Sequence, residues 1–186
     1  MAHNADLERI IGAPQFESSV APWRDMERFI GTRLPDDYKR TFDMYPRLEF
    51  DGFLGAFHPG LDAEQYVERC RRVLDPLRQL ILEQGAIRSI DDSGQVQSMS
   101  PYPLFPEVGG LLHWGGTQNG DMCLWLTSDS DPNQWPVVVT DHRDYWRYDG
   151  GFAAFLVGVM QQTIRCPIFP KTFPHEMRVD QFEVHG

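Results

Sequence analysis

The chain has 186 residues, of which 41% are hydrophobic and 24% charged, which indicates a single globular domain over residues 1–186 and excludes a disordered or fibrous protein. Its 17 Lys and Arg against 27 Asp and Glu leave a net charge of −10. This charge disfavours nucleic acid or an anionic membrane as a direct partner, because both repel an acidic surface. The three cysteines show no CxxC or Cys/His spacing, so neither a disulfide framework nor a zinc site is indicated.

Neither the N-terminus nor the apolar segments predict export or membrane insertion. The first residues, MAHNADLERIIGAP, lack a basic patch followed by an apolar core, so we expect no signal peptide. The most apolar window, FAAFLVGVM, is far shorter than the roughly 20 residues of a membrane span. We therefore expect a cytoplasmic protein.

The first half of the chain shows three helical patterns. Residues 22–30 place apolar side chains at helical spacing on one face. Residues 35–45 begin with a proline and two aspartates, whose carboxylates suit the first turn of a helix, and Pro46 ends the pattern. Residues 61–84 carry the longest apolar stripe, but Pro76 interrupts it, so we expect a kink or two shorter helices.

Strand patterns lie between and after these helices. Residues 48–57 are strand-like with a turn at Asp51–Gly52. The polar segment 85–101 predicts a flexible loop or the tip of a hairpin. From Tyr102 the chain becomes rich in apolar strand patterns. We place the strands in LFPEVGGLLHWG (104–115), DMCLWLT (121–127) and WPVVVTD (135–141).

The end of the chain combines one apolar helix with a proline-rich tail. Residues 149–163 predict a helix with a buried stripe. Prolines interrupt residues 165–186, so we expect an extended tail that ends in an edge strand. Helices and strands are partly segregated and short turns dominate the middle of the chain. The pattern therefore predicts an α+β fold with a largely antiparallel sheet flanked by helices.

The glycine-rich stretch HWGGTQNGDMCLWLT, residues 113–127, could be a ligand-binding loop or a turn between two strands. A phosphate-binding loop needs a helix after its glycines, and here a strand pattern follows Gly120. Asn119–Gly120 instead predicts a two-residue type I′ turn, which would place Trp114 opposite Trp125. In that register His113 lies about 17 Å along the strands from Asp121, too far for a catalytic dyad. We expect His113 to be a core or edge histidine.

A second candidate site lies in TDHRDYW, after the apolar run 137–139. Asp141, His142 and Asp144 are residue types that bind a divalent metal ion, and a small metal-dependent hydrolase built on them is an alternative function. The competing interpretation is a solvated turn. Nucleophilic catalysis finds no support, since the chain contains no G-x-S-x-G motif and no cysteine in a recognisable nucleophile setting.

The order of several motifs resembles the SUKH superfamily, which comprises yeast cell-wall regulators and bacterial immunity proteins. The step between two helices, LPDDYK, is similar to the leucine-proline-x-x-tyrosine step of that family. The remaining matches are Trp23 to Leu34, GGLLHWGGTQNGD (109–121), LWLT (124–127), WPVVVTD (135–141) and Tyr148 to Leu156. Residues 61–101 match less well, and we expect them to be an elaboration comprising the long helix and the polar loop.

The resemblance implies a non-catalytic binding protein, with no cofactor, no metal and no catalytic residue. It suggests an immunity protein that neutralises a cognate toxin, and the acidic chain favours a basic toxin domain as partner. A regulatory scaffold without a toxin is the other non-enzymatic alternative. We predict that partner contacts come from acidic loops and aromatic anchors. The residues of this predicted surface are Asp129, Asp131, Trp135, Asp141, Asp144 and Trp146, with Asp91 and Asp92 as a second patch.

Overall fold

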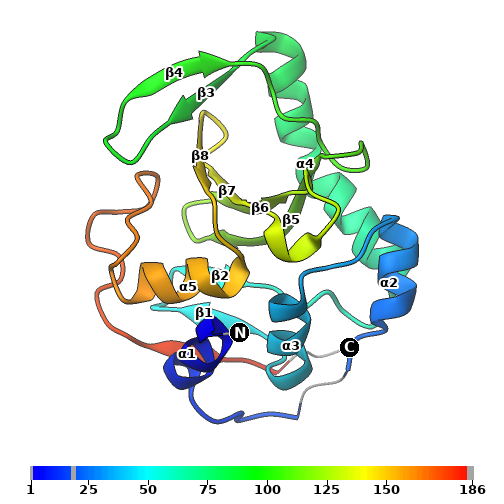
Figure 1. The fold of residues 1–186 in the computed structure, drawn as a ribbon, viewed down its shortest axis with the longest axis vertical. Coiled ribbons are helices and arrows are strands. Elements are labelled where there is room, and N and C mark those ends of the chain that lie inside the picture. Colours follow the sequence, from blue (N-terminus) through cyan, green and yellow to red (C-terminus); the bar gives the residue numbers. More distant parts are fainter. Residues whose placement is uncertain (1, 18–19, 184–186) are drawn as a thin grey trace.

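The computed structural model describes residues 2–17 and 20–183, which form a single α+β domain of five α-helices and a nine-stranded, mostly antiparallel sheet (Figure 1). The last three residues of the predicted tail lie outside the described part. The helices are α1 (Ala2–Ile11), α2 (Trp23–Ile30), α3 (Asp36–Met44), α4 (Ala63–Gln84) and α5 (Phe152–Met160). The strands are β1 (Leu48–Phe50), β2 (Leu54–Ala56), β3 (Ile87–Ile90), β4 (Val96–Met99), β5 (Leu111–Thr117), β6 (Met122–Leu126), β7 (Val137–Thr140), β8 (Asp144–Tyr148) and β9 (Val179–Gln181).

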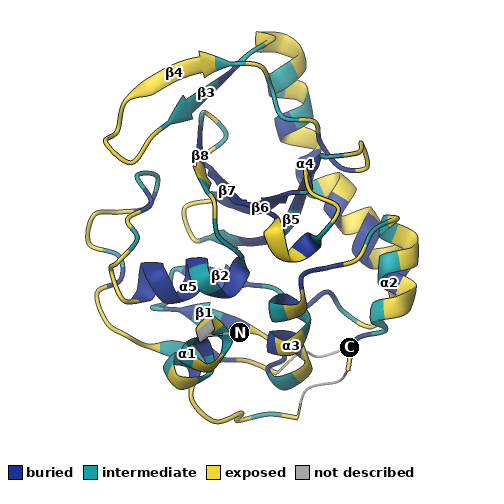
Figure 2. Ribbon diagram, viewed as in Figure 1, coloured by how far each residue is buried: buried dark blue, intermediate teal, exposed yellow. Residues whose placement is uncertain are grey.

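The sheet has the strand order β4-β3-β8-β7-β6-β5-β2-β1-β9. All neighbouring strands pair antiparallel except β3 and β8, which are parallel. Every residue of β6 and β7 is buried, as expected for central strands covered on both faces. Figure 2 shows the contrast with the edge strand β4, which is largely exposed. The sheet thus forms a rigid centre that carries exposed loops at its ends.

An aromatic cluster joins the helices to the middle of the sheet. The ring of Tyr38 in α3 packs edge-on against Trp125 of β6 and Phe152 of α5, with ring centroids 4.8 Å and 5.3 Å away. The ring of Trp114 in β5 lies 5.0 Å from Phe152 in the same geometry. Edge-to-face pairs of this kind are worth about 0.5–1.5 kcal/mol beyond the burial of their area. Figure 1 shows α1, α3 and α5 gathered together, whereas α4 runs along another part of the sheet.

The predicted type I′ turn at Asn119–Gly120 is wrong. Thr117 donates its backbone N–H to the carbonyl of Asp121, and the three residues between them, 118–120, form the turn, in which Gly120 is left-handed with φ +89° and Asn119 is not. Thr117 and Asp121 close the loop: the Thr117 hydroxyl donates to Oδ2 of Asp121 at 2.7 Å and accepts the Asp121 backbone N–H at 3.2 Å. A three-residue loop with a left-handed glycine is the next most common hairpin connection. The side-chain hydrogen bonds between Thr117 and Asp121 favour the three-residue loop in this chain.

The strand register also differs from the predicted one. Trp125 lies opposite Leu112 rather than Trp114, because one extra residue stands between His113 and Gly115 in β5. The ring centroids of Trp114 and Trp125 still lie 6.0 Å apart. A Cβ at Gly115 would lie 2.5 Å from the carbonyl oxygen of Gly55 in the neighbouring strand, so only glycine fits after the bulge.

Other expectations are confirmed, with changes in detail. The predicted turn is present at Asp51–Gly52, where both residues have positive φ, and residues 51–53 connect β1 to β2. The segment expected to be a flexible loop or a hairpin tip contains both strands of a hairpin, β3 and β4, and only residues 91–95 form its tip. The tail contains the edge strand β9, as expected. Helix α4 is continuous across Pro76 instead of dividing into two shorter helices. Its buried residues Leu74 and Leu77 lie on both sides of the proline and anchor the helix to the core. Residues 105–109 form turns instead of strand, and Leu104 makes only an isolated bridge to Leu111.

Candidate partner-binding surface

The acidic loop 128–135 is held in one conformation by its own side chains. Asp129 accepts the backbone N–H of Asp131 at 2.8 Å, and Asp131 accepts the backbone N–H of Asn133 at 3.1 Å. The Asn133 side chain then bonds to Asp36 at the start of α3, accepting its backbone N–H at 2.9 Å and donating to its carboxylate at 3.1 Å. The Asn133 bond and the ammonium of Lys39 lower the pKa of Asp36. Asp36 is therefore charged at neutral pH, and the hydrogen bonds hold the side chains of Asp129 and Asp131 in position.

The prediction that Trp135 contacts a partner is wrong for this conformation. Its side chain is only 1% exposed, and its ring lies 6.3 Å from that of Trp125 in the core. The indole N–H donates to the backbone carbonyl of Asp129 at 2.7 Å. The buried Trp135 therefore anchors the acidic loop to the core, whereas residues 128–130 of the loop are exposed.

A cavity of about 370 Å³ lies beside this loop, between the end of α2, the 105–109 turn and residues 127–130. Ile30, Phe105 and Leu112 contribute apolar side chains to its lining. Two carboxylate side chains, Glu107 and Asp129, also line it. Neither is within ion-pair distance of a cationic side chain in the part of the chain that the structure describes. The cavity therefore combines an apolar lining with uncompensated negative charge.

The sequence pattern did not single out Glu107, Asn133 or Asp36 as parts of this surface. Glu107 reaches the cavity because the 104–110 segment turns back beside β5, and the sequence predicted a strand there. Asn133 and Asp36 are 97 positions apart in the chain, so no local pattern indicates their contact. The only available signal was the Asp131–Pro132–Asn133 run, which is typical of a turn.

Asp141, His142 and Asp144 do not assemble into a joint site. Oδ1 of Asp141 accepts the backbone N–H of Arg143 and of Asp144, at 3.0 Å and 2.7 Å, which shapes the turn. Asp144 forms an ion pair with Arg88 of β3 at 2.9 Å. Within residues 2–17 and 20–183, no group of three His, Cys, Asp or Glu side chains is arranged to hold a metal ion.

The predicted surface is divided between two ends of the sheet. Loop 128–135 precedes β7 and the turn at 141–143 follows it. The four residues of β7 alone span about 13 Å. Asp129 and Asp131 therefore belong to one surface, and Asp141 belongs to another.

The second predicted patch, Asp91 and Asp92, lies at the tip of the β3–β4 hairpin. Asp91 accepts the Ser93 hydroxyl and the backbone N–H groups of Gln95 and Ser93, and these hydrogen bonds, that of the Ser93 hydroxyl above all, lower the pKa of Asp91. Asp92 accepts the indole N–H of Trp146 at 2.8 Å. The Trp146 side chain is 2% exposed, so the prediction that it contacts a partner is wrong. It ties the hairpin to β8.

The three cysteines are buried in the interior, and His113 in β5 is half-buried. Burial and the nearby Arg69 lower the pKa of His113 to about 4, so its imidazole is neutral at pH 7. All three cysteines are free and buried, and burial raises the pKa of the Cys70 thiol to about 11.

Among the described helices, none combines the length and the apolar character that a membrane span requires. Compared with family models, curated proteins and solved structures, the chain matches none, so the SUKH resemblance rests on its sequence motifs.

Proposed function

We propose that this chain is a non-catalytic binding protein that docks onto a basic protein surface. The observation that carries the proposal is the cavity between α2 and residues 127–130, where Glu107 and Asp129 carry unpaired charge next to an apolar lining. A Lys or Arg side chain matches this chemistry, because its aliphatic stem packs on apolar groups while its cationic end reaches a carboxylate. The net charge of −10 would steer a basic partner towards the surface.

The pre-organised loop supports a binding function for a second reason. Ordering a flexible loop on association costs about 0.5–1.5 kcal/mol for each immobilised side chain. Here Asp129, Asp131 and Asn133 are already held by hydrogen bonds to the loop backbone and to Asp36. A partner therefore meets the carboxylates in position and avoids much of this cost.

The SUKH resemblance narrows the proposal to an immunity protein whose partner is a basic toxin domain. Occupation of the cavity by one Lys or Arg of the toxin would anchor the complex, and the rest of the surface would cover the toxin. A regulatory scaffold would use the same contact without any toxin. A metal-dependent hydrolase has less support, because Asp144 is paired with Arg88 and Asp141 shapes a turn.

The test compares two double variants that change the net charge equally. Glu107→Gln with Asp129→Asn removes the charge at the cavity and keeps the side-chain shapes. Glu83→Gln with Glu176→Gln is the control, since both residues are exposed and lie outside the cavity. Calorimetry measures binding to the protein encoded beside this chain's gene. Loss of a desolvated charge contact costs roughly 2 kcal/mol or more, so we expect at least about 30-fold weaker binding for the cavity variant.

The control variant should bind within about threefold of the wild type, as expected for exposed charges. Equal weakening by both variants, or a neighbouring protein that does not bind, would contradict the proposal. A growth assay separates the two non-enzymatic alternatives: an immunity protein rescues cells that express the neighbouring protein, whereas a scaffold does not. Elemental analysis of the wild type and of His142→Ala checks the hydrolase, which predicts a stoichiometric metal that the variant lacks.

A further inference from the structure

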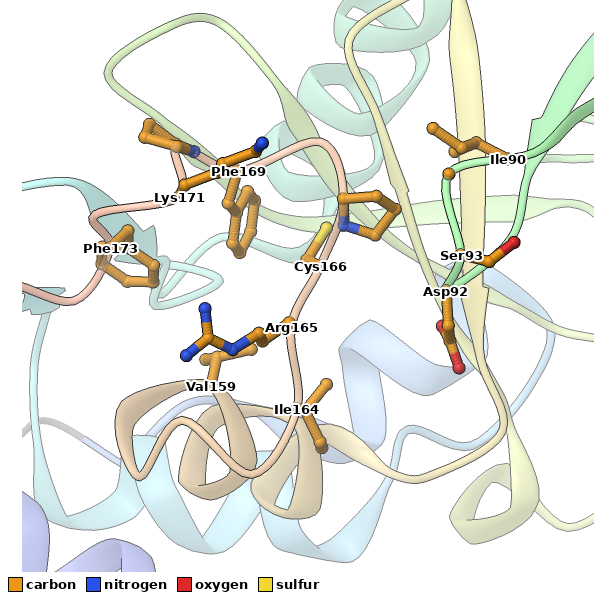
Figure 3. Close-up of a pocket in the computed structure, with 13 residues that line it drawn as sticks. Ile90, Asp92, Ser93, Val159, Ile164, Arg165, Cys166, Phe169, Lys171 and Phe173 are labelled. Carbon is orange, nitrogen blue, oxygen red and sulfur yellow. The ribbon is translucent and has the colours of Figure 1, made fainter.

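A second cavity, of about 390 Å³, lies between the tip of the β3–β4 hairpin and the segment that follows α5. Figure 3 shows Ile90, Asp92 and Ser93 on the hairpin side, with Cys166 and Phe169 on the side of the tail. It is separate from the cavity beside loop 128–135, and the two share no lining residue. Cavities of roughly 300–1,000 Å³ are of the size that holds small organic ligands.

The tail side of this cavity is apolar and firmly packed. The rings of Phe169 and Phe173 meet edge-to-face with centroids 5.5 Å apart, and Phe53 of the β1–β2 turn contacts both. Val159 and Ile164 extend the apolar lining at the end of α5. Because this apolar lining is already packed in the absence of a ligand, the apolar part of a ligand can bind to it without a rearrangement of these side chains.

The thiol in this lining behaves as part of the apolar surface. The side chain of Cys166 is buried, and burial raises its pKa to about 12, so it carries no charge at neutral pH. A thiol with a raised pKa is a poor nucleophile, since the thiolate is the reactive form. We therefore infer that Cys166 contacts the ligand as part of the apolar lining and does not act as a nucleophile.

The rim is cationic, although the whole chain is acidic. Residues 150–175 contain no Asp or Glu, while the chain has 27 of them. Two cations of this segment, Arg165 and Lys171, line the cavity, and both are exposed. Neither forms an ion pair with any described residue. The one acid in the lining, Asp92, already accepts the Trp146 indole N–H.

From the apolar lining, the two unpaired cations and the volume, we propose that this cavity binds a small amphipathic anion: an apolar body of medium length that carries one carboxylate. The body packs against Phe169 and Phe173, and the carboxylate accepts hydrogen bonds from Arg165 and Lys171. Cationic ligands are disfavoured, since they would bring a third positive charge to the rim. Neutral ones leave both cations without a partner.

The test titrates the full chain with octanoate, octan-1-ol and octylammonium and follows backbone amide shifts by NMR. All three probes have eight carbon atoms in an unbranched chain, and their head groups differ in charge. We expect octanoate to shift amides of residues 90–94 and 164–173, and to bind at least about tenfold more tightly than the other two. Equal binding of all three, or shifts elsewhere in the chain, would overturn the proposal.

Two charge-matched variants identify the cations responsible. Arg165→Gln with Lys171→Gln should weaken octanoate binding at least about tenfold, because both head-group contacts are lost. Arg24→Gln with Arg71→Gln changes the net charge equally at exposed positions outside the cavity and should leave binding within about twofold. Equal effects of both variants would refute the assignment. A peptide ending in Leu with a free carboxylate is the last arm. If it binds more than tenfold more tightly than octanoate, the occupant is a protein terminus and the small-molecule assignment is wrong.

Discussion

Replacement of Asp37 by alanine should destabilise the fold, because Asp37 of α3 forms a hydrogen bond to the first turn of α5. The N-cap of α5 is Gly151, which offers no side chain to the free N–H groups of the first turn. Asp37 of α3 supplies the missing acceptor: one carboxylate oxygen accepts the backbone N–H of Ala153 at 2.9 Å, and the other accepts that of Tyr38 at 2.8 Å. A side chain distant in sequence therefore caps the helix that carries much of the aromatic core.

The size of the loss in unfolding free energy follows from the burial of the Ala153 backbone N–H, which has no acceptor in Asp37→Ala. Ala153 is 1% exposed, so water cannot replace the lost acceptor. An unsatisfied buried N–H costs about 1–3 kcal/mol, and loss of a helix cap costs a similar amount, so we expect Asp37→Ala to lower the free energy of unfolding by about 2 kcal/mol. For a chain of 186 residues this corresponds to a melting temperature lower by about 4–8 °C. Urea denaturation followed by tryptophan fluorescence measures the change.

Asp37→Asn separates the hydrogen bonds from the charge. Burial raises the pKa of Asp37 above its ordinary 3.8, so the ionised form is less favoured in the folded state than in the unfolded state. The ionisation of Asp37 therefore lowers stability as the pH rises from 3.8 through the folded pKa. The asparagine keeps an acceptor and has no charge to desolvate, so it should cost less than half as much as alanine and remove this pH dependence.

The control is Asp25→Ala, which removes an exposed carboxylate from the first turn of α2. It should change the free energy of unfolding by less than about 1 kcal/mol. If Asp37→Ala costs no more than this control, the cap between the helices does not contribute as argued. The same conclusion follows if the asparagine and alanine variants are equally unstable.

Three further predictions test the core. Gly110→Ala should lower the free energy of unfolding by about 1–3 kcal/mol in the same urea assay, because its Cβ would lie 2.7–2.8 Å from backbone atoms of Leu104, Phe105 and Glu107; wild-type stability would contradict the close packing. Cys70, Cys123 and Cys166 should react with a disulfide reagent at pH 8 only after unfolding, since all are buried with raised pKa values; rapid labelling of one native thiol would place it at the surface. The lowered pKa of His113, about 4 against 6.5, means that stability falls as the pH drops from 6.5 towards 4; His113→Gln should flatten this part of the profile, and an unchanged slope would assign it to other groups.

The sequence by itself determined the helices α2, α3, α4 and α5 and the central strands, because each of these has a local cause. Apolar side chains at helical spacing, prolines at helix starts, and runs of Val and Leu act within a few residues of one another. The buried stripe of α4 and the fully buried β6 could be read in this way. Helix α1 was not predicted, since its apolar stripe is weak and its packing against α5 is long-range.

The tertiary structure alone decided the register and the surface. The bulge at Trp114 arises because the loop closes with the Thr117–Asp121 pair and because β2 approaches the glycines of β5, and neither contact is visible in a local pattern. Trp146 resembles an interface residue in the sequence, but the hairpin tip 91–95 brings Asp92 to its indole N–H and the ring lies in the core. Both candidate cavities join segments far apart in the chain, and only long-range packing brings such segments together.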